Sequence, residues 1–220
     1  INPLPFLKPK PNPKISAISK KYSNSVILFS PARLFSLTTG ELNQQKNLIL
    51  VFKALNILKN RDINNFVLVS IYNNIDKFLN NFADKNVSKI IKENNIEDNI
   101  ELISVIDPDD MPAFYAGADI VCVPSLYETF GLMYLEAMLS GKIVISSNQG
   151  GPLEFIKDGK TGFCVDPYDE IKLADLLEKL IKDKLLRKKI GLAARKSVQK
   201  YSVKNMVDQI ESIYLKLFNS

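Results

Sequence analysis

The sequence has 220 residues, enough for one large domain or two small ones, and its 46% hydrophobic and 24% charged residues exclude an intrinsically disordered chain. No apolar run reaches the roughly 18 residues that a membrane-spanning helix needs, and the net charge of +5 permits but does not require a polyanionic partner. The chain contains no histidine, which excludes a Ser–His–Asp triad, a Cys–His dyad and a histidine-bound zinc ion. Catalysis must then use carboxylates, Lys or Arg side chains or backbone dipoles, or a base that lies outside this chain.

Residues 1–21 hold five of the eleven prolines and five lysines without any acidic residue. Proline lacks the N–H group that regular elements use, so an extended linker or interdomain segment is predicted here. The chain begins with Ile1 rather than Met, and this segment lacks the apolar centre of a signal peptide. We therefore expect the sequence to be cut from a longer protein.

Short apolar and β-branched runs predict buried strands at residues 25–30, 66–71, 100–104, 119–123, 142–146 and 162–165. Helical periodicity fills most of the intervals, at residues 46–59, 73–94, 109–117 and 131–140, with a short helical turn near 151–157. Continuous apolar strands that alternate with helices are typical of a parallel sheet covered on both faces. The sequence therefore predicts an α/β fold, a doubly wound parallel sheet of about six strands.

The pattern after residue 169 is entirely helical, with predicted helices at 169–182, 184–199 and 204–218. Residues 179–200 carry nine Lys or Arg residues against the single acid Asp183. A solvated helix face is the favoured interpretation, and a basic amphipathic helix on an anionic membrane surface is the alternative. Nucleic acid is not expected as a partner, because no stacking aromatic residues are interleaved with these charges.

The two cysteines, Cys122 and Cys164, each lie in a short apolar run. Two cysteines cannot form a disulfide-rich secreted scaffold, so we expect reduced thiols in the core. The reduced cysteines and the missing signal peptide predict a cytoplasmic protein. Any contact with a membrane is expected to be peripheral, at its cytoplasmic face.

Polar and flexible residues follow the predicted strands. They form the stretches 31–33, 106–110, 124–131 and 147–151, and six of the nine glycines lie between Gly131 and Gly162. Ligands of open parallel sheets bind beyond the carboxyl ends of the strands, so these stretches are expected to form a site at one edge.

The stretch ETFGLMYLE, from Glu128 to Glu136, is the most informative part of that edge. A helix beginning near Phe130 or Gly131 places Glu136 on the apolar stripe with leucines at helical spacing. A buried carboxylate needs donors, which a ribose diol or a core Lys or Arg could supply. Glu128 lies either at the mouth of this helix, where the free N–H groups of residues 130–132 can meet phosphate or sugar oxygens, or in a loop as a solvated acid.

Other charges are expected near the same edge. Arg33 follows the first strand and Lys46 opens the first helix, so the two cations could neutralise a diphosphate without metal, or could be surface charges. The Gly150–Gly151 pair predicts a tight turn into a short helix capped by Glu154, and a possible anion nest. The D-x-D pattern of residues 107–109 is interpreted as the approach to a helix N-cap at Asp109 or Asp110, and no metal or other cofactor is expected.

The stretch SLYETFGLMYLEAMLSGKIVISSNQGGPLEFIKDGKTGFCVDPYD resembles the signature block of glycosyltransferase family 4, a group of retaining enzymes with the GT-B fold. Glu128 and Glu136 match the family's E-x7-E motif, and residues 32–34 followed by a lysine resemble its GRL…K motif. The resemblance covers residues 25–200 and only the C-terminal, nucleotide-sugar half of such an enzyme. It implies a Rossmann-like sheet with C-terminal helices.

The resemblance also implies roles for single residues. Arg33 and Lys46 would hold the donor's phosphates, and Glu128 would meet the hydroxyls of the donor sugar. Glu136 would bind the ribose, residues Thr129, Phe130, Gly131 and Leu132 would bind sugar or phosphate oxygens, and the base would lie against the loop that includes Ser104, Val105 and Ile106. The sequence departs from the family at an insertion between Arg33 and Lys46 and at Asn47, where glycine is common.

These observations predict the donor-binding half of a hexosyltransferase that retains anomeric configuration and uses a UDP-, GDP- or ADP-sugar. A glycan, lipid-linked or other acceptor would bind to an N-terminal domain absent from this chain. Residues 22–200 would form the donor-binding domain, and residues 201–220 would form a helix that packs toward the absent domain. The chain alone would bind donor and turn over nothing. The alternative is a non-catalytic nucleotide-sugar-binding or scaffold module of the same fold.

Overall fold

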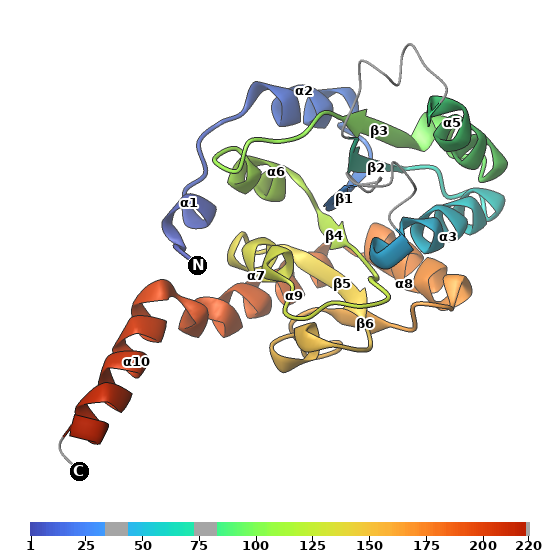
Figure 1. Ribbon diagram of the computed structural model, residues 1–220. Helices are drawn as coiled ribbons and strands as arrows, with labels where there is room; N and C mark the ends of the chain where they lie inside the picture. Colours follow the sequence, from blue (N-terminus) through green and yellow to red (C-terminus); the bar gives the residue numbers. More distant parts are fainter. Residues whose placement is uncertain (34–43, 73–82, 219–220) are drawn as a thin grey trace.

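The computed structural model describes residues 1–33, 44–72 and 83–218 (Figure 1). A six-stranded sheet occupies its centre, in the order β3-β2-β1-β4-β5-β6, and every pair of neighbouring strands is parallel. The strands are β1 (Val26–Arg33), β2 (Phe66–Ile71), β3 (Ile100–Ile103), β4 (Ile120–Cys122), β5 (Ile143–Ser147) and β6 (Phe163–Val165). The predicted α/β fold with a doubly wound parallel sheet is confirmed.

Strand residues alternate between two hydrophobic layers. Leu28 of β1 faces a layer closed by α3 (Leu48–Asn60), α5 (Ala83–Glu93) and α8 (Glu170–Lys182). Phe29, the next residue, faces a layer closed by α6 (Met111–Gly117) and α7 (Leu132–Leu139). Because successive side chains of a strand point to opposite faces, a sheet that is covered on both sides needs apolar residues at every position. That requirement explains the uninterrupted apolar runs of the sequence.

The strand order reverses between β1 and β4, which pair directly at Leu28 with Ile120 and at Phe29 with Val121. Connections on the two sides of such a point diverge, and the carboxyl ends of the strands there border a crevice. Arg33 ends β1, and the loop of residues 123–131 follows β4. The fold therefore brings these two predicted site segments to the same place.

The prediction of an extended conformation for residues 1–21 is wrong for two stretches, α1 (Leu4–Leu7) and α2 (Pro13–Lys21). Asn12 caps α2 by accepting a hydrogen bond from the Lys14 N–H at 2.9 Å, and proline fits the first turn, where its missing N–H is not needed. Ile15 and Ile18 are buried in the layer that α6 and α7 close. Pro13 thus stands at a helix start, while Pro9 and Pro11 lie between the two helices. An interdomain role for this segment stays a prediction.

Helix α9 (Lys184–Val198) follows α8, and η4 (Gln199–Tyr201) follows α9. The apolar side of α9 is buried in the core through Ile190, Ala194 and Val198. Its exposed side carries lysines and the two leucines Leu185 and Leu192. Since the core already uses the apolar face of α9, the structure favours the solvated-face interpretation, and contact with an anionic membrane stays a prediction.

The last helix, α10 (Val203–Phe218), extends away from the sheet (Figure 1) and has no buried residue. Its predicted packing toward another domain stays a prediction. Residues 73–82 of the predicted helix 73–94 and the insertion after Arg33, residues 34–43, lie outside the described residues. Within the described ranges, no helix is both long enough and apolar enough to cross a membrane.

Candidate functional site

The loop between β4 and α7, residues 123–131, is fixed from one side by η1 (Gln44–Lys46), the short helix before α3. The N–H of Leu126 donates to the carbonyl of Gln45 at 2.8 Å, and the side chain of Gln45 donates to the carbonyl of Tyr127 at 3.1 Å. Two segments far apart in sequence therefore run together at the carboxyl edge of the sheet, where the strand order reverses.

The packing of η1 against this loop also brings two predicted site residues together. The ammonium group of Lys46 lies 2.7 Å from a carboxylate oxygen of Glu128. The side chain of Lys46 is 20% exposed and that of Glu128 is 12% exposed, so neither is a solvated surface charge. Despite the insertion before it, Lys46 lies beside the loop of Glu128, and its assignment as the phosphate lysine stays a prediction.

Asn47, which follows this lysine, has the left-handed backbone conformation with φ 53° and ψ 39°. Glycine adopts this conformation without strain, and asparagine is among the few other residues that tolerate it. The amide of Asn47 donates to the carbonyls of Pro124 at 3.2 Å and Pro167 at 2.7 Å. The departure from glycine thus preserves the backbone turn and adds two bonds, one of them to the start of the 123–131 loop.

The diglycine holds the loop from its other side. The N–H of Gly151 donates to the carbonyl of Glu128 at 3.0 Å, and a Cβ atom on Gly151 would lie 1.8 Å from the carbonyl oxygen of Thr129. Gly150 has φ +84°, and its Cβ would lie 2.6 Å from the carbonyl oxygen of Glu128. The Gly151 N–H, considered for an anion nest, is therefore used within the protein. The glycines allow η3 (Gly151–Glu154) to approach the backbone that carries Glu128.

Helix α7 begins at Leu132, with Gly131 at its N-cap in the left-handed conformation, φ 81°. The ring of Phe130 packs edge-on against Phe155 at 5.6 Å between centroids. Thr129 and Leu132 are exposed on either side of this anchored ring. None of the backbone hydrogen bonds between described residues uses the N–H of Phe130 or Gly131, so these groups can meet the anionic or hydroxyl oxygens of a ligand.

Glu136 lies one turn further along α7 and has a different partner from Glu128. Its Oε2 atom accepts a hydrogen bond from the hydroxyl of Tyr115 at 2.9 Å. Burial raises the pKa of Glu136 above its ordinary value, while the bond from Tyr115 and the amino group of Ile1 act in the opposite direction. In the described part of the chain Glu136 is thus inward-facing, as predicted, but paired with a tyrosine and not with a core Lys or Arg.

The remaining predicted site residues end two strands. Arg33 is exposed at the end of β1, where its pairing with Ile71 follows an irregularity after Ser30. After β3, Ser104 accepts a hydrogen bond from the Lys14 ammonium at 3.3 Å, Val105 is exposed and Ile106 is partly buried. Among the described residues, no hydrogen bond or ion pair joins Arg33 or residues 104–106 to the Lys46–Glu128 pair, so their assigned roles stay predictions.

The D-x-D pattern forms a turn. Asp107 accepts a hydrogen bond from the N–H of Asp109 at 3.0 Å, and Asp110 occupies the N-cap position of α6. The predicted cap position is correct, but the side chain of Asp110 makes no capping bond. Within residues 1–33, 44–72 and 83–218, no group of three or more His, Cys, Asp or Glu residues could hold a metal ion. The absence of a functional metal stays a prediction.

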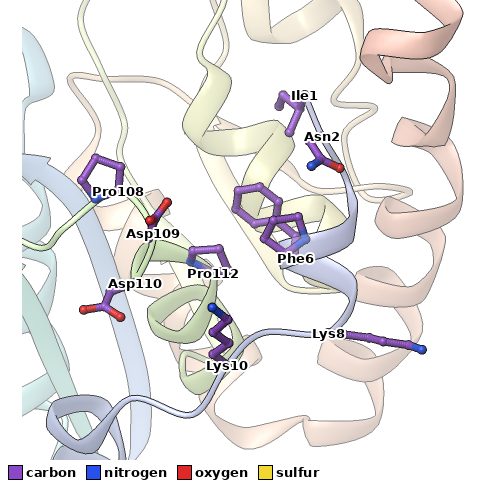
Figure 2. Close-up of a pocket in the computed structure, with 10 residues that line it drawn as sticks. Ile1, Asn2, Phe6, Lys8, Lys10, Pro108, Asp109, Asp110 and Pro112 are labelled. Atoms are coloured by element: carbon purple, nitrogen blue, oxygen red, sulfur yellow. The ribbon is translucent and has the colours of Figure 1, made fainter.

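A cavity of about 650 Å³ separates the amino-terminal segment from the start of α6 (Figure 2). Its lining includes Phe6, Lys10, Asp109, Asp110 and Pro112, and neither Glu128 nor Glu136 is part of it. The ring of Phe6 also contacts Tyr115 at 6.1 Å between centroids. The cavity is therefore a neighbour of the Tyr115–Glu136 pair, and neither Lys46 nor Glu128 lines it.

In a doubly wound parallel sheet, ligands bind at the point where the strand order reverses, and the cluster of acidic and basic loop residues lies at that point here. Comparison with protein families matches residues 22–197 to the family described as Glycosyl transferases group 1. This match covers most of the sequence, and the chain belongs to that family.

Individual relatives agree with the assignment. The D-inositol 3-phosphate glycosyltransferase of Corynebacterium diphtheriae is 37% identical over 107 residues, 49% of this chain and 25% of the relative. A solved glycosyltransferase of Rickettsia africae superposes with a TM-score of 0.78 at 26% identity, over 99% of this chain and 55% of that one.

A third match is to a domain that was crystallised on its own. The crystallised C-terminal domain of a glycosyl transferase group 1 family protein, LpcC of Francisella tularensis, gives a TM-score of 0.71 at 26% identity. The alignment covers 92% of this chain and 99% of that domain. By contrast, the chain spans about a quarter to a third of the length of the curated relatives it matches, 25% and 34% for two of them.

Replacement of Gly151 by alanine is expected to destabilise the protein by about 1–3 kcal/mol, since the new Cβ would overlap backbone atoms that cannot rotate away. Urea unfolding measures the change. Gly159→Ala is the comparison: its Cβ position is open but its φ is +67°, so this variant carries the strain of the left-handed backbone, about 1 kcal/mol, without any overlap, and it should destabilise less than Gly151→Ala. Equal destabilisation by the two substitutions would show that the contact with Thr129 does not matter.

Glu136→Gln is expected to raise the melting temperature at pH 7. The raised pKa of Glu136 means that the native state favours the protonated acid, so the carboxylate costs stability once the pH exceeds the raised pKa. Below the ordinary value of 4.5 both folded and unfolded states carry the acid, and the difference between variant and parent should vanish. Glu211→Gln on exposed α10 is the control. If the difference in melting temperature between Glu136→Gln and the parent grew toward acid pH, the raised pKa of Glu136 would be contradicted.

Proposed function

We propose that this chain is the donor-binding part of a retaining, family 4 glycosyltransferase of GT-B architecture, which transfers a hexose from a UDP-, GDP- or ADP-sugar to a glycan, lipid-linked or other acceptor. The observation that carries the proposal is the ion pair of Lys46 with Glu128 at the strand reversal. A cation and a carboxylate held 2.7 Å apart at the mouth of a helix offer partners for a phosphate and a sugar hydroxyl side by side.

In the proposed reaction, the oxygen of an acceptor hydroxyl attacks the anomeric carbon while the bond from that carbon to the diphosphate breaks. The acceptor's proton passes to an oxygen of the departing diphosphate, which accounts for a donor domain without histidine. Lys46 and Arg33 stabilise the negative charge that develops on the diphosphate, and the free amides at the start of α7 orient its oxygens. Glu128 accepts hydrogen bonds from the sugar, and Glu136 accepts them from the ribose.

Family membership supports sugar transfer, and the names of the relatives support a glycosidic product for those proteins. The proposal further includes an N-terminal domain of the same protein that binds the acceptor, so the chain alone binds donor without turnover. It also includes a cytoplasmic location, with a membrane as at most a peripheral surface. No step of the proposed reaction uses a metal ion or another cofactor.

The nucleotide-binding part of the proposal predicts that UDP, GDP or ADP raises the melting temperature of the chain, since a ligand that binds only the native state stabilises it. Glu136→Ala should weaken binding of that nucleotide about tenfold or more, the effect of losing hydrogen bonds to a charged acceptor. Glu128→Ala should leave nucleotide affinity close to that of the parent, because Glu128 is assigned to the sugar. Calorimetric titration measures all three affinities.

Glu211→Ala on α10 controls for the loss of a carboxylate outside the site. A chain that no nucleotide or nucleotide sugar stabilises would support the alternative, a scaffold module that retains the fold without the ligand. If Glu136→Ala and Glu128→Ala both bound nucleotide and nucleotide sugar like the parent, the site assignment would be wrong even in an active enzyme.

A further inference from the structure

The hydrogen bond between Tyr115 and Glu136 joins two helices that sequence analysis did not connect. Tyr115 lies on α6 and Glu136 on α7, 21 positions further along the chain. The whole side chain of Tyr115 is buried, with 0% exposure, and its hydroxyl donates to Oε2 of Glu136 at 2.9 Å. A hydroxyl buried to this extent is costly unless it has a partner, and Glu136 is the partner it has.

The ring of Tyr115 is held on two sides. Phe29 of β1 meets it edge-on, with 5.7 Å between centroids and 71° between planes, and Phe6 of α1 packs against it at 6.1 Å. A rigid aromatic ring between two others leaves its hydroxyl little freedom of position. The direction of the hydrogen bond to Glu136 is therefore set by the core and not by the glutamate.

A fixed donor on Oε2 restricts where Oε1 can lie, because the two oxygens belong to one planar group. No hydrogen bond between described residues uses Oε1 of Glu136. A glutamate on a helix ordinarily samples several rotamers, and ordering it at the moment of binding costs free energy. A carboxylate held in place beforehand binds a pair of hydroxyls without that cost.

We propose that Tyr115 is a positioning residue for nucleotide binding: its hydroxyl holds Oε2 of Glu136 so that Oε1 is presented to the ribose hydroxyls of the donor nucleotide. This inference rests on the proposed function, since it needs a nucleotide at Glu136. Tyr115 itself does not touch the ligand, and it acts through Glu136.

The electrostatics of the pair are consistent with this role. Burial raises the pKa of Glu136, and the hydrogen bond from Tyr115 lowers it. The other group acting on Glu136 from the described residues is the amino group of Ile1, which also lowers the pKa. Only the ionised carboxylate accepts from two hydroxyls at once. The tyrosine therefore extends the pH range in which Glu136 is a good acceptor.

The test is calorimetric titration of the full chain with UDP, GDP and ADP between pH 4.5 and 7.5, for the parent and for Tyr115→Phe. The variant loses one oxygen and keeps the ring packing. At pH 7 its affinity for the nucleotide that the parent binds should fall about three- to tenfold, the free-energy cost of ordering one side chain at the moment of binding. The acid limb of its affinity profile should move to higher pH, because Glu136 loses the bond that lowers its pKa.

Tyr22→Phe is the matched control, since the hydroxyl of Tyr22 donates to a carboxylate oxygen of Glu101 at 2.8 Å, the same chemistry outside the proposed site. It should leave affinity and pH profile unchanged. Glu136→Gln should bind weakly and without the acid limb. Glu136→Asp keeps the charge but is too short to reach the hydroxyl of Tyr115, so its affinity should fall nearly as much as that of Glu136→Gln. This variant provides a second test of the positioning role if Tyr115→Phe fails to fold.

The outcomes separate the two claims. A parent chain that binds none of the three nucleotides overturns the proposed function, and the positioning role with it. A parent that binds while Tyr115→Phe keeps both the affinity and the pH midpoint overturns the positioning role alone. Full affinity in Glu136→Asp would likewise show that orientation by Tyr115 is not needed.

Discussion

The ion pair between Lys46 and Glu128 is the contact on which the candidate site depends. It joins the start of the first long helix to the loop after β4, across the point where the strand order reverses. Both side chains are largely buried, at 20% and 12% exposure, so the loss of either partner leaves the other charge poorly solvated, which costs more than the loss of a surface pair. The hydrogen bonds of Gln45, Asn47 and Gly151 to the same loop keep this pair in place.

The two acids of the E-x7-E motif, Glu128 and Glu136, have different interaction partners. Glu128 has a cation, whereas the groups that act on Glu136 among the described residues are the hydroxyl of Tyr115 and the amino group of Ile1, and burial raises the pKa of Glu136. A fold selected for stability alone would place a neutral residue at position 136. A strained or costly group that persists in an otherwise consistent structure is typical of a functional position. The proposed contact with the ribose explains why a costly carboxylate is present at this position.

Sequence patterns predicted the architecture well because strand and helix periodicity report burial directly. All six strands and the helices of the core lie where apolar periodicity placed them. The amino-terminal segment was predicted incorrectly, because proline and lysine content suggested a linker while the apolar spacing of Ile15 and Ile18 decided for a helix packed against α6. Composition is averaged over a segment and does not report the spacing of its apolar residues. In this segment two isoleucines at helical spacing pack into the core.

By itself, the sequence determined the parallel α/β sheet, the edge at which the site lies and the residue types that its chemistry needs, since these follow from local periodicity and from the ends of strands. Only the tertiary structure decided the partners. Three contacts illustrate this: Lys46 with Glu128, Tyr115 with Glu136, and Gly151 with Thr129. Each depends on the distance between segments that are remote along the chain. Such distances are set by the packing of helices on the sheet, and no spacing in the sequence encodes them.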